Sequence, residues 1–81
     1  MNILISNINP SLIESDLRRL FKAFGEIGAI EILRDKLNNR SSGRALVQMP
    51  RIQEGRQAVS ALHGMLLDGK SIVVREMPDE S

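Results

Sequence analysis

The chain has 81 residues, of which 42% are apolar and 26% are charged, a balance that fits one folded domain and excludes a disordered chain. Its formal net charge of +1 gives little long-range attraction for nucleic acid, so any such binding depends on where the charges lie. Cysteine is absent, which excludes disulfides and thiolate metal sites, and no apolar run is long enough to span a membrane.

A strand and the start of a helix are predicted at the beginning of the chain. Residues 2–8 are rich in β-branched side chains and predict a strand in which Ile3 and Ile5 face the core. Ser11 and Glu14 stand three residues apart, which is the spacing of a capping box. The sequence therefore predicts that a helix begins at Ser11 or a residue or two later.

An amphipathic helix and a second strand follow. The apolar face of the helix comprises Leu17, Leu20, Phe21 and Phe24. Gly25 fits the end of this helix, and residues 27–34 predict a strand with Ile30 and Ile32 directed inward. Both phenylalanines of the chain are therefore expected in the core.

Residues 42–49 alternate between two sets of side chains, which is the period of a pleated strand. The first set is apolar, suits a core, and comprises Ala45, Val47 and Met49. The second set is mixed, suits an open face, and comprises Ser42, Arg44, Leu46 and Gln48. Polar residues at 35–41 predict the turn that precedes this strand. One buried and one open face are typical of an antiparallel sheet that is covered on one side only.

The last third of the chain predicts a second helix and a fourth strand. Residues 53–63 are amphipathic, with an inward face that comprises Ala58, Val59, Leu62 and Met65. Residues 67–70, Leu-Asp-Gly-Lys, predict a turn. Residues 71–76 predict a strand with Ile72 and Val74 inward and with Val73 and Arg75 outward.

The predicted order is β-α-β-β-α-β in one domain, residues 1–77, followed by a short tail at 78–81. Right-handed crossovers place both helices on one face of a four-stranded antiparallel sheet. The expected fold class is α+β, with the architecture of a ferredoxin-like sandwich. Because this fold hosts many functions, the open face has to indicate the function.

Five stretches carry motifs in a fixed order. Residues 3–8 read Ile-Leu-Ile-Ser-Asn-Ile, residues 16–21 read Asp-Leu-Arg-Arg-Leu-Phe, and residues 42–49 read Ser-Gly-Arg-Ala-Leu-Val-Gln-Met. Ala-Leu-His-Gly at 61–64 and Leu-Asp-Gly-Lys at 67–70 complete the set. In this order and spacing they resemble the RNA recognition motif family, whose longer strand signature is Lys/Arg-Gly-aromatic-Gly/Ala-aromatic-Val-any-aromatic. The resemblance covers residues 2–76 and implies the binding of single-stranded RNA.

The departures from the family pattern lie on the expected open face. The family stacks bases on aromatic side chains of the two central strands, where this chain has Leu4, Arg44 and Leu46. Tyr and Trp are absent from the chain, and Ser42 replaces the basic residue that begins the longer signature. Each stacked base contributes about 1–3 kcal/mol, so the resemblance implies RNA binding that is weak and poorly selective. The planar guanidinium of Arg44 is expected to recover part of the loss.

The resemblance and the alternation together indicate a candidate RNA-binding surface. It comprises Leu4, Ser6, Asn7, Glu31, Leu33, Arg40, Arg44, Leu46, Gln48, Val73 and Arg75. Arg44 and Arg75 suit contacts to phosphate or base, or else are ordinary solvated charges, and Glu31 opposes the binding of an anion. Four apolar members favour an alternative, in which the same face binds another protein or a second copy of the chain. A register shift of one residue would exchange them with the core.

The sequence indicates no enzyme, cofactor or metal site. His63 is the only histidine and lies at an expected helix end, where the helix dipole accounts for it better than a bound ligand does. A glycine loop for phosphate and a nucleophile with a nearby histidine are both missing from the sequence. Without a recognisable signal peptide, the protein is expected to be cytoplasmic and to have no membrane partner.

Overall fold

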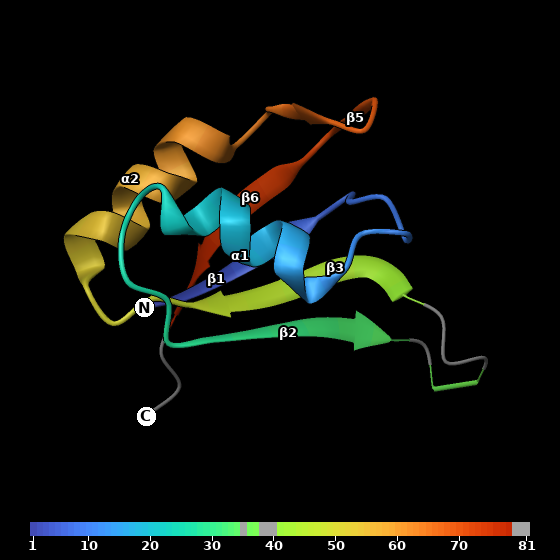
Figure 1. Cartoon of the computed structure of the whole chain (residues 1–81), viewed down its shortest axis with the longest axis horizontal. Helices are drawn as coiled ribbons and strands as arrows, with labels where there is room; N and C mark the ends of the chain where they lie inside the picture. Colours follow the sequence, from blue (N-terminus) through green and yellow to red (C-terminus); the bar gives the residue numbers. More distant parts are fainter. Residues whose placement is uncertain (35, 38–40, 79–81) are drawn as a thin grey trace.

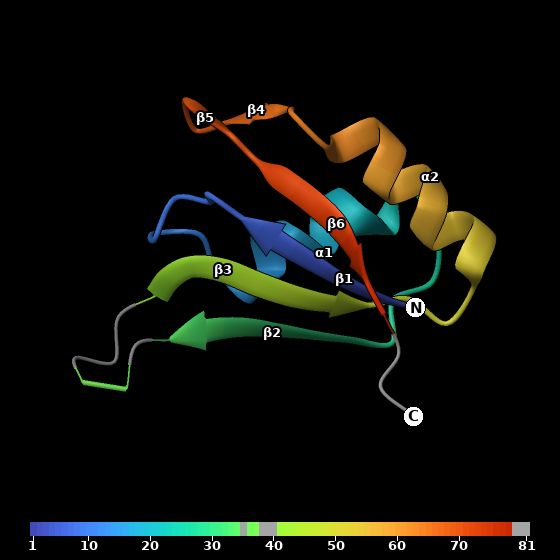
Figure 2. The same cartoon turned by 180° about the vertical axis from the view of Figure 1, so that it is seen from behind.

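The computed structural model describes residues 1–34, 36–37 and 41–78. The elements are β1 (Asn2–Ser6), α1 (Glu14–Lys22), β2 (Ala29–Arg34), β3 (Ser41–Gln48), α2 (Ile52–Leu62), β4 (Leu66–Leu67), β5 (Lys70–Ser71) and β6 (Val73–Met77). The four longer strands form an antiparallel sheet in the order β2-β3-β1-β6, and both helices pack on one face of it (Figure 1). Seen from behind, the sheet stands in front of the helices (Figure 2). The predicted ferredoxin-like sandwich is confirmed.

The core lies between the sheet and the helices. It comprises Ile3, Ile5, Ile8, Leu12, Leu17, Phe21, Ala45, Val47, Met49, Ala58, Leu62, Ile72 and Val74. Phe24, Ile30 and Ile32 are partly buried and pack against this cluster. Every second residue of the central strands is therefore buried, as the alternation predicts. The observed strand pairing keeps these residues on the helix side, so the one-residue register shift that would exchange the two faces does not occur in the paired residues.

The first strand is shorter than predicted. It ends at Ser6 rather than at Ile8, because Asn7 adopts a φ of 60° and so turns the chain out of the extended conformation. The side-chain amide of Asn7 donates to the carbonyl oxygen of Ser71 at 2.9 Å, which holds this turn against β5. Local backbone geometry, rather than β-propensity, therefore sets the end of β1.

The capping box predicted at Ser11 is wrong. The backbone N–H and the hydroxyl of Ser11 both donate to Oδ1 of Asn9, at 3.0 and 2.9 Å, so Ser11 belongs to a turn that precedes the helix. α1 begins at Glu14, and the carboxylate of Asp16 accepts a hydrogen bond from the N–H of Ile13 at 3.2 Å. The carboxylate of Asp16, the third residue of α1, thus satisfies the N–H of Ile13, the residue that caps the helix.

A small hairpin, β4–β5, was not predicted. The sequence indicated only a turn at this place, and the structure pairs Leu66 with Ser71 across it. Asp68 and Gly69 have φ values of 51° and 79°, the two positive angles that a type I′ hairpin turn requires. Strands of two residues are too short to carry an alternating pattern. The other bounds differ from the predicted ones by one or two residues.

His63 links α2 to the edge of the sheet. Its Nδ1 accepts a hydrogen bond from the N–H of Val74 at 3.1 Å. Val74 lies in β6, which is an edge strand, so this N–H points away from β1 and is open to pairing with another chain unless something covers it. The sequence attributed His63 to the helix dipole, whereas the structure uses it as an acceptor that protects the edge.

Candidate functional site

The sheet face opposite the helices is lined by the outward residues of all four strands. Its middle row runs Glu31, Leu46, Leu4, Arg75 from β2 across to β6, each residue directly opposite the next. The two leucines are half-buried at the centre of the row, and the two charged residues are exposed at its ends. An apolar centre thus lies between one anionic and one cationic side chain.

A second row lies on the side of the predicted β2–β3 turn. In it Leu33 stands opposite Arg44, and Ser6 stands opposite Val73. Leu33 and Val73 therefore belong to the two outer strands and lie diagonal to the central leucines. The four apolar residues predicted for this face do share it, with Leu4 and Leu46 as its central pair.

A β-bulge lies next to Arg44, at one end of the face. Leu33 pairs with Arg44 while Arg34 pairs with Ser41, so β3 carries two extra residues, Ser42 and Gly43, at this point. Gly43 has a φ of +78°, and its carbonyl oxygen accepts a hydrogen bond from the N–H of Ile8 at 3.1 Å. The signature glycine is therefore required by backbone geometry, and two extra residues leave unchanged the alternation that turns Arg44 outward.

Gly43→Ala is expected to lower the free energy of unfolding by about 2–3 kcal/mol. The positive φ alone costs an L-residue about 1–2 kcal/mol, and a Cβ at this position would lie 3.2 Å from the carbonyl oxygen of Ile8. Gly64→Ala is the matched control, because its φ of +83° is similar but a Cβ there meets nothing within 4 Å. Urea unfolding measures both. Equal losses in the two variants would contradict the role of the contact with Ile8.

The charges of the face are few. Among the described residues, Arg44 and Arg75 are its cations and Glu31 is its anion. The ion pairs among the described residues lie elsewhere. Arg18 and Glu14 pair along α1 at 3.1 Å, and Arg56 of α2 pairs with Glu76 on the helix side of β6 at 3.9 Å. Arg44 and Arg75 are therefore available for a ligand.

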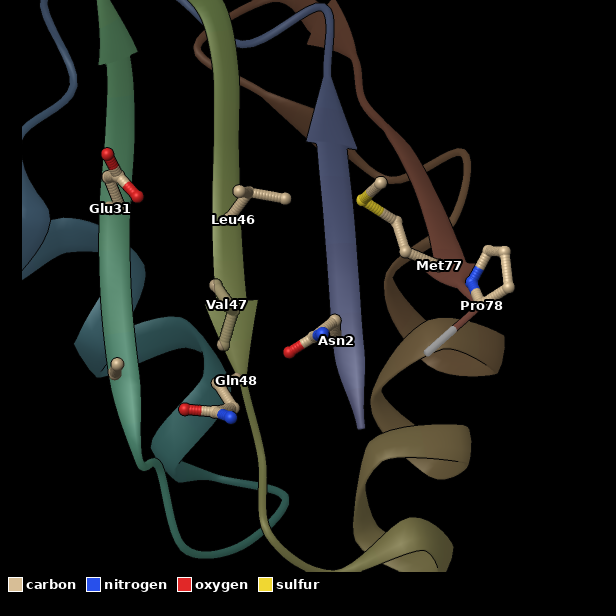
Figure 3. Close-up of a pocket in the computed structure, with 8 residues that line it drawn as sticks. Asn2, Glu31, Leu46, Val47, Gln48, Met77 and Pro78 are labelled. Atoms are coloured by element: carbon tan, nitrogen blue, oxygen red, sulfur yellow. The ribbon is translucent and has the colours of Figure 1, made fainter. Parts of the chain in front are cut away.

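A hollow of about 500 Å³ lies at the end of the face where the chain enters β1 (Figure 3). It is lined by Asn2, Ala29, Glu31, Leu46, Val47, Gln48, Met77 and Pro78. In register, Ala29 and Asn2 stand on either side of Gln48, and Met77 stands opposite Asn2. Figure 3 shows Asn2 and Gln48 on the neighbouring strands β1 and β3 at the lower end of the view, with Met77 on the β6 side and Glu31 on the β2 side.

Most residues of the candidate surface lie where the sequence places them. Those on the open face are Leu4, Ser6, Glu31, Leu33, Arg44, Leu46, Gln48, Val73 and Arg75. Asn7 instead lies in the turn after β1, where its amide bonds to Ser71. Arg40 lies outside the described residues.

Sequence reasoning left five residues of the hollow out of the site, namely Asn2, Ala29, Val47, Met77 and Pro78. Asn2 and Met77 could have been predicted, because each lies two residues beyond a site residue, Leu4 or Arg75, and therefore on the same face of its strand. Ala29 has no chemical signal of its own, and its place depends on which strands are neighbours. Met49, by contrast, matches the last position of the longer signature but is completely buried, so this position belongs to the core.

Two other kinds of site find no support in the described part of the chain. Within residues 1–34, 36–37 and 41–78, His, Asp and Glu side chains form no group of three or more that could hold a metal ion. Over the same ranges, the helices are too short and too polar for one of them to traverse a bilayer.

Comparison with known families assigns the chain. The model of the RNA recognition motif family matches residues 3–73. The chain belongs to the RNA recognition motif family. Polyadenylate-binding protein 6 of Arabidopsis thaliana is 36% identical over 74 residues, which are 91% of this chain and 14% of that protein. The Sex-lethal homolog of Musca domestica is 33% identical over 70 residues, 86% of this chain and 22% of that protein. The chain spans less than a quarter of either relative.

Solved structures of RNA recognition motifs have the same fold. The crystal structure of RNA-binding protein PG1 has a TM-score of 0.94 and 27% identity, over 100% of this chain and 98% of that one. A Sex-lethal protein–RNA complex has a TM-score of 0.85 and 32% identity, over 91% of this chain and 46% of that one. The likeness of fold therefore extends to the whole sheet and both helices.

Proposed function

We propose that this chain binds single-stranded RNA on the open face of its sheet, with Leu4, Arg44, Leu46 and Arg75 as the main contacts. The observation that carries the proposal is the central Leu4–Leu46 pair, with Arg75 directly opposite Leu4 and Arg44 two residues from Leu46 on β3. Neither arginine has an ion-pair partner among the described residues. Apolar side chains offer a surface to the faces of bases, and the guanidinium groups reach phosphates or lie against bases. Membership of the RNA recognition motif family and the likeness to a Sex-lethal protein–RNA complex support it.

We expect this binding to be weak and poorly selective over most of the face. Aromatic stacking contributes about 1–3 kcal/mol per base, and leucine supplies only part of that. Leucine also reads no hydrogen-bonding pattern, and an arginine that binds phosphate does not distinguish bases. The contacts proposed for Leu4, Leu46, Arg44 and Arg75 therefore accept any base.

A titration tests the proposal directly. Adding pooled short oligoribonucleotides to isotope-labelled protein is expected to shift the amide resonances of β1, β3 and β6 and to leave those of the helices unchanged. The apparent affinity is expected to fall as salt rises, because bound phosphates release counterions. Shifts confined to the helix side, or no shifts at millimolar RNA, would rule the proposal out.

The same leucines would serve an alternative function, in which the face binds another protein or a second copy of the chain. Burial weakens this alternative, since Leu4, Leu33, Leu46 and Val73 are each half-buried. On this face only Met77, which is 37% exposed, counts as an exposed large apolar residue among those described. Interfaces that bind apolar partners usually present a larger continuous patch.

Two substitutions of opposite charge at Leu46 separate the two functions. Leu46→Lys and Leu46→Asp remove the same apolar contact from the centre of the face but differ in charge. For RNA, we expect both variants to lose the apolar contact, and the Lys variant to bind about tenfold more tightly than the Asp variant, because lysine attracts phosphates and aspartate repels them.

An apolar protein partner would respond differently, because both variants would lose it. Fluorescence anisotropy with a labelled oligoribonucleotide measures the first effect, and sedimentation at several concentrations measures self-association. Equal loss of RNA binding in the Lys and Asp variants would contradict the proposed electrostatic contribution. Circular dichroism checks that both variants remain folded.

A further inference from the structure

The hollow on the open face carries polar groups that the proposed contacts do not use. Glu31 stands on its β2 side, and Gln48 stands diagonal to Glu31, because Glu31 pairs with Leu46 and Ala29 pairs with Gln48. Both side chains are exposed, and neither forms a side-chain hydrogen bond or an ion pair with a described residue. Leu46 and Met77 complete the walls with apolar surface.

The carboxylate of Glu31 restricts what can bind here. A phosphate beside it would be repelled, so an RNA that crosses this end of the face must turn another group toward it. An ionised carboxylate accepts hydrogen bonds and donates none, and it binds two parallel N–H groups best. The group that faces Glu31 must therefore be a donor, and preferably a pair of adjacent donors.

Among the four RNA bases, guanine has such a pair. Its N1–H and N2–H point in the same direction, as the N–H groups of an arginine side chain do. Adenine and cytosine each offer an exocyclic amine beside a ring nitrogen that accepts, and uracil offers one N–H between two carbonyl oxygens. Each of these three would turn an acceptor toward the carboxylate and be repelled by it.

Gln48 completes the match. The O6 of guanine accepts a hydrogen bond and lies next to N1–H, so the base edge reads acceptor, donor, donor. The amide NH₂ of Gln48 and the two carboxylate oxygens of Glu31 read donor, acceptor, acceptor. Diagonal residues on adjacent strands are within reach of one another when their side chains are long, so one base can meet both. The thioether of Met77 suits contact with an aromatic ring.

We propose that the hollow is a subsite for one guanine base, held by Glu31 and Gln48 through its Watson–Crick edge, with Leu46 and Met77 against the ring. This inference rests on the proposed function, since it concerns one position of an RNA bound to the same face. It adds one selective position to a surface that otherwise accepts any base.

Four hexamers of uridine test the proposal, each carrying guanosine, adenosine, cytidine or inosine at one central position, with the plain hexamer for reference. By fluorescence anisotropy, we expect the guanosine hexamer to bind about tenfold more tightly than the plain one, the lower end of what a bidentate contact to a base supplies. Inosine keeps O6 and N1–H but lacks the N2 amine. Its hexamer is therefore expected to lose most of the gain.

Glu31→Gln is the decisive variant, and Glu76→Gln is its matched control. Both remove one negative charge, but Glu76 lies on the helix side of β6, 3.9 Å from Arg56. We expect Glu31→Gln to bind the five hexamers within about twofold of one another, because its amide no longer matches two donors. Glu76→Gln is expected to keep the tenfold preference for guanosine.

The possible results separate this inference from the function on which it rests. If every hexamer binds but guanosine gains nothing, or if Glu31→Gln keeps the guanosine preference, the subsite is wrong and RNA binding stands. The guanosine hexamer is also compared with the same hexamer carrying 2′-deoxyguanosine at the central position. If Glu31→Gln abolishes a preference for the ribose form, the carboxylate binds the 2′-hydroxyl and the subsite is again wrong. If no hexamer binds at millimolar concentration, both proposals fail together.

Discussion

The double variant Leu4→Tyr with Leu46→Phe is expected to bind short single-stranded RNA roughly 30-fold more tightly than the original chain. Stacking on an aromatic contributes about 1–3 kcal/mol per base, and the lower value applies because each leucine already supplies some contact. The two residues stand directly opposite each other on β1 and β3 and are half-buried on the open side of the sheet. Larger rings can extend into solvent there without disturbing the core.

Leu66→Tyr is the matched control for this gain. Leu66 is 71% exposed and lies in β4, which belongs to the small hairpin and not to the four-stranded sheet. It adds an aromatic ring to the protein surface away from the face. Fluorescence anisotropy with one labelled oligoribonucleotide compares the variants. A gain in the control equal to that of the double variant would show nonspecific stacking and would contradict the assignment of the face.

The alternating pattern of the strands predicted which residues share a face, and it did so for a physical reason. A slip of one residue in β1 would place Leu4 in the core and expose Ile3 and Ile5, both of which are completely buried. The free energy of burying those side chains fixes the register, so the pattern and the structure must agree. The same holds in β3 for Ala45 and Val47, whose outward neighbours form the centre of the site.

The ends of the elements were harder to predict, because local hydrogen bonds decide them. The spacing of Ser11 and Glu14 matches a capping box, yet Asn9 competes for the hydroxyl and N–H of Ser11 and prevails. The positive φ of Asn7 ends β1 early although Ile8 continues the β-branched run. In both cases the side chain of an asparagine near the boundary forms a hydrogen bond, with Ser11 in one case and with Ser71 in the other. Helix and strand propensities do not include such bonds.

The hollow could be predicted only in part. Glu31 and Gln48 were placed on the open face from their own strands, but their diagonal arrangement depends on β2 pairing with β3 in one particular register. Met77 reaches the hollow because β6 pairs with β1 on the far side. These are long-range pairings, and a single sequence carries no signal for them beyond the family resemblance. The chemistry of the subsite therefore becomes visible only in the structure.

Phe21→Ala is expected to have the largest effect on stability, with a loss of about 3–5 kcal/mol in the free energy of unfolding. Phe21 is completely buried in the core, on the helix side of the sheet. A domain of this size has a total stability of roughly 4–12 kcal/mol, so the variant is expected to be partly unfolded at 37 °C. Urea or thermal unfolding, followed by circular dichroism, measures the loss.

Phe24→Ala provides the control, because it removes the same side chain from a partly buried position three residues further along the chain. We expect it to cost about half as much, since less apolar surface leaves the core. Neither phenylalanine lies on the open face, so saturating RNA is expected to restore the folded fraction of Phe21→Ala by binding the native state alone. A folded Phe21→Ala protein that no longer binds RNA would mean that the helix side takes part in binding, and the assignment of function to the bare face of the sheet would be wrong.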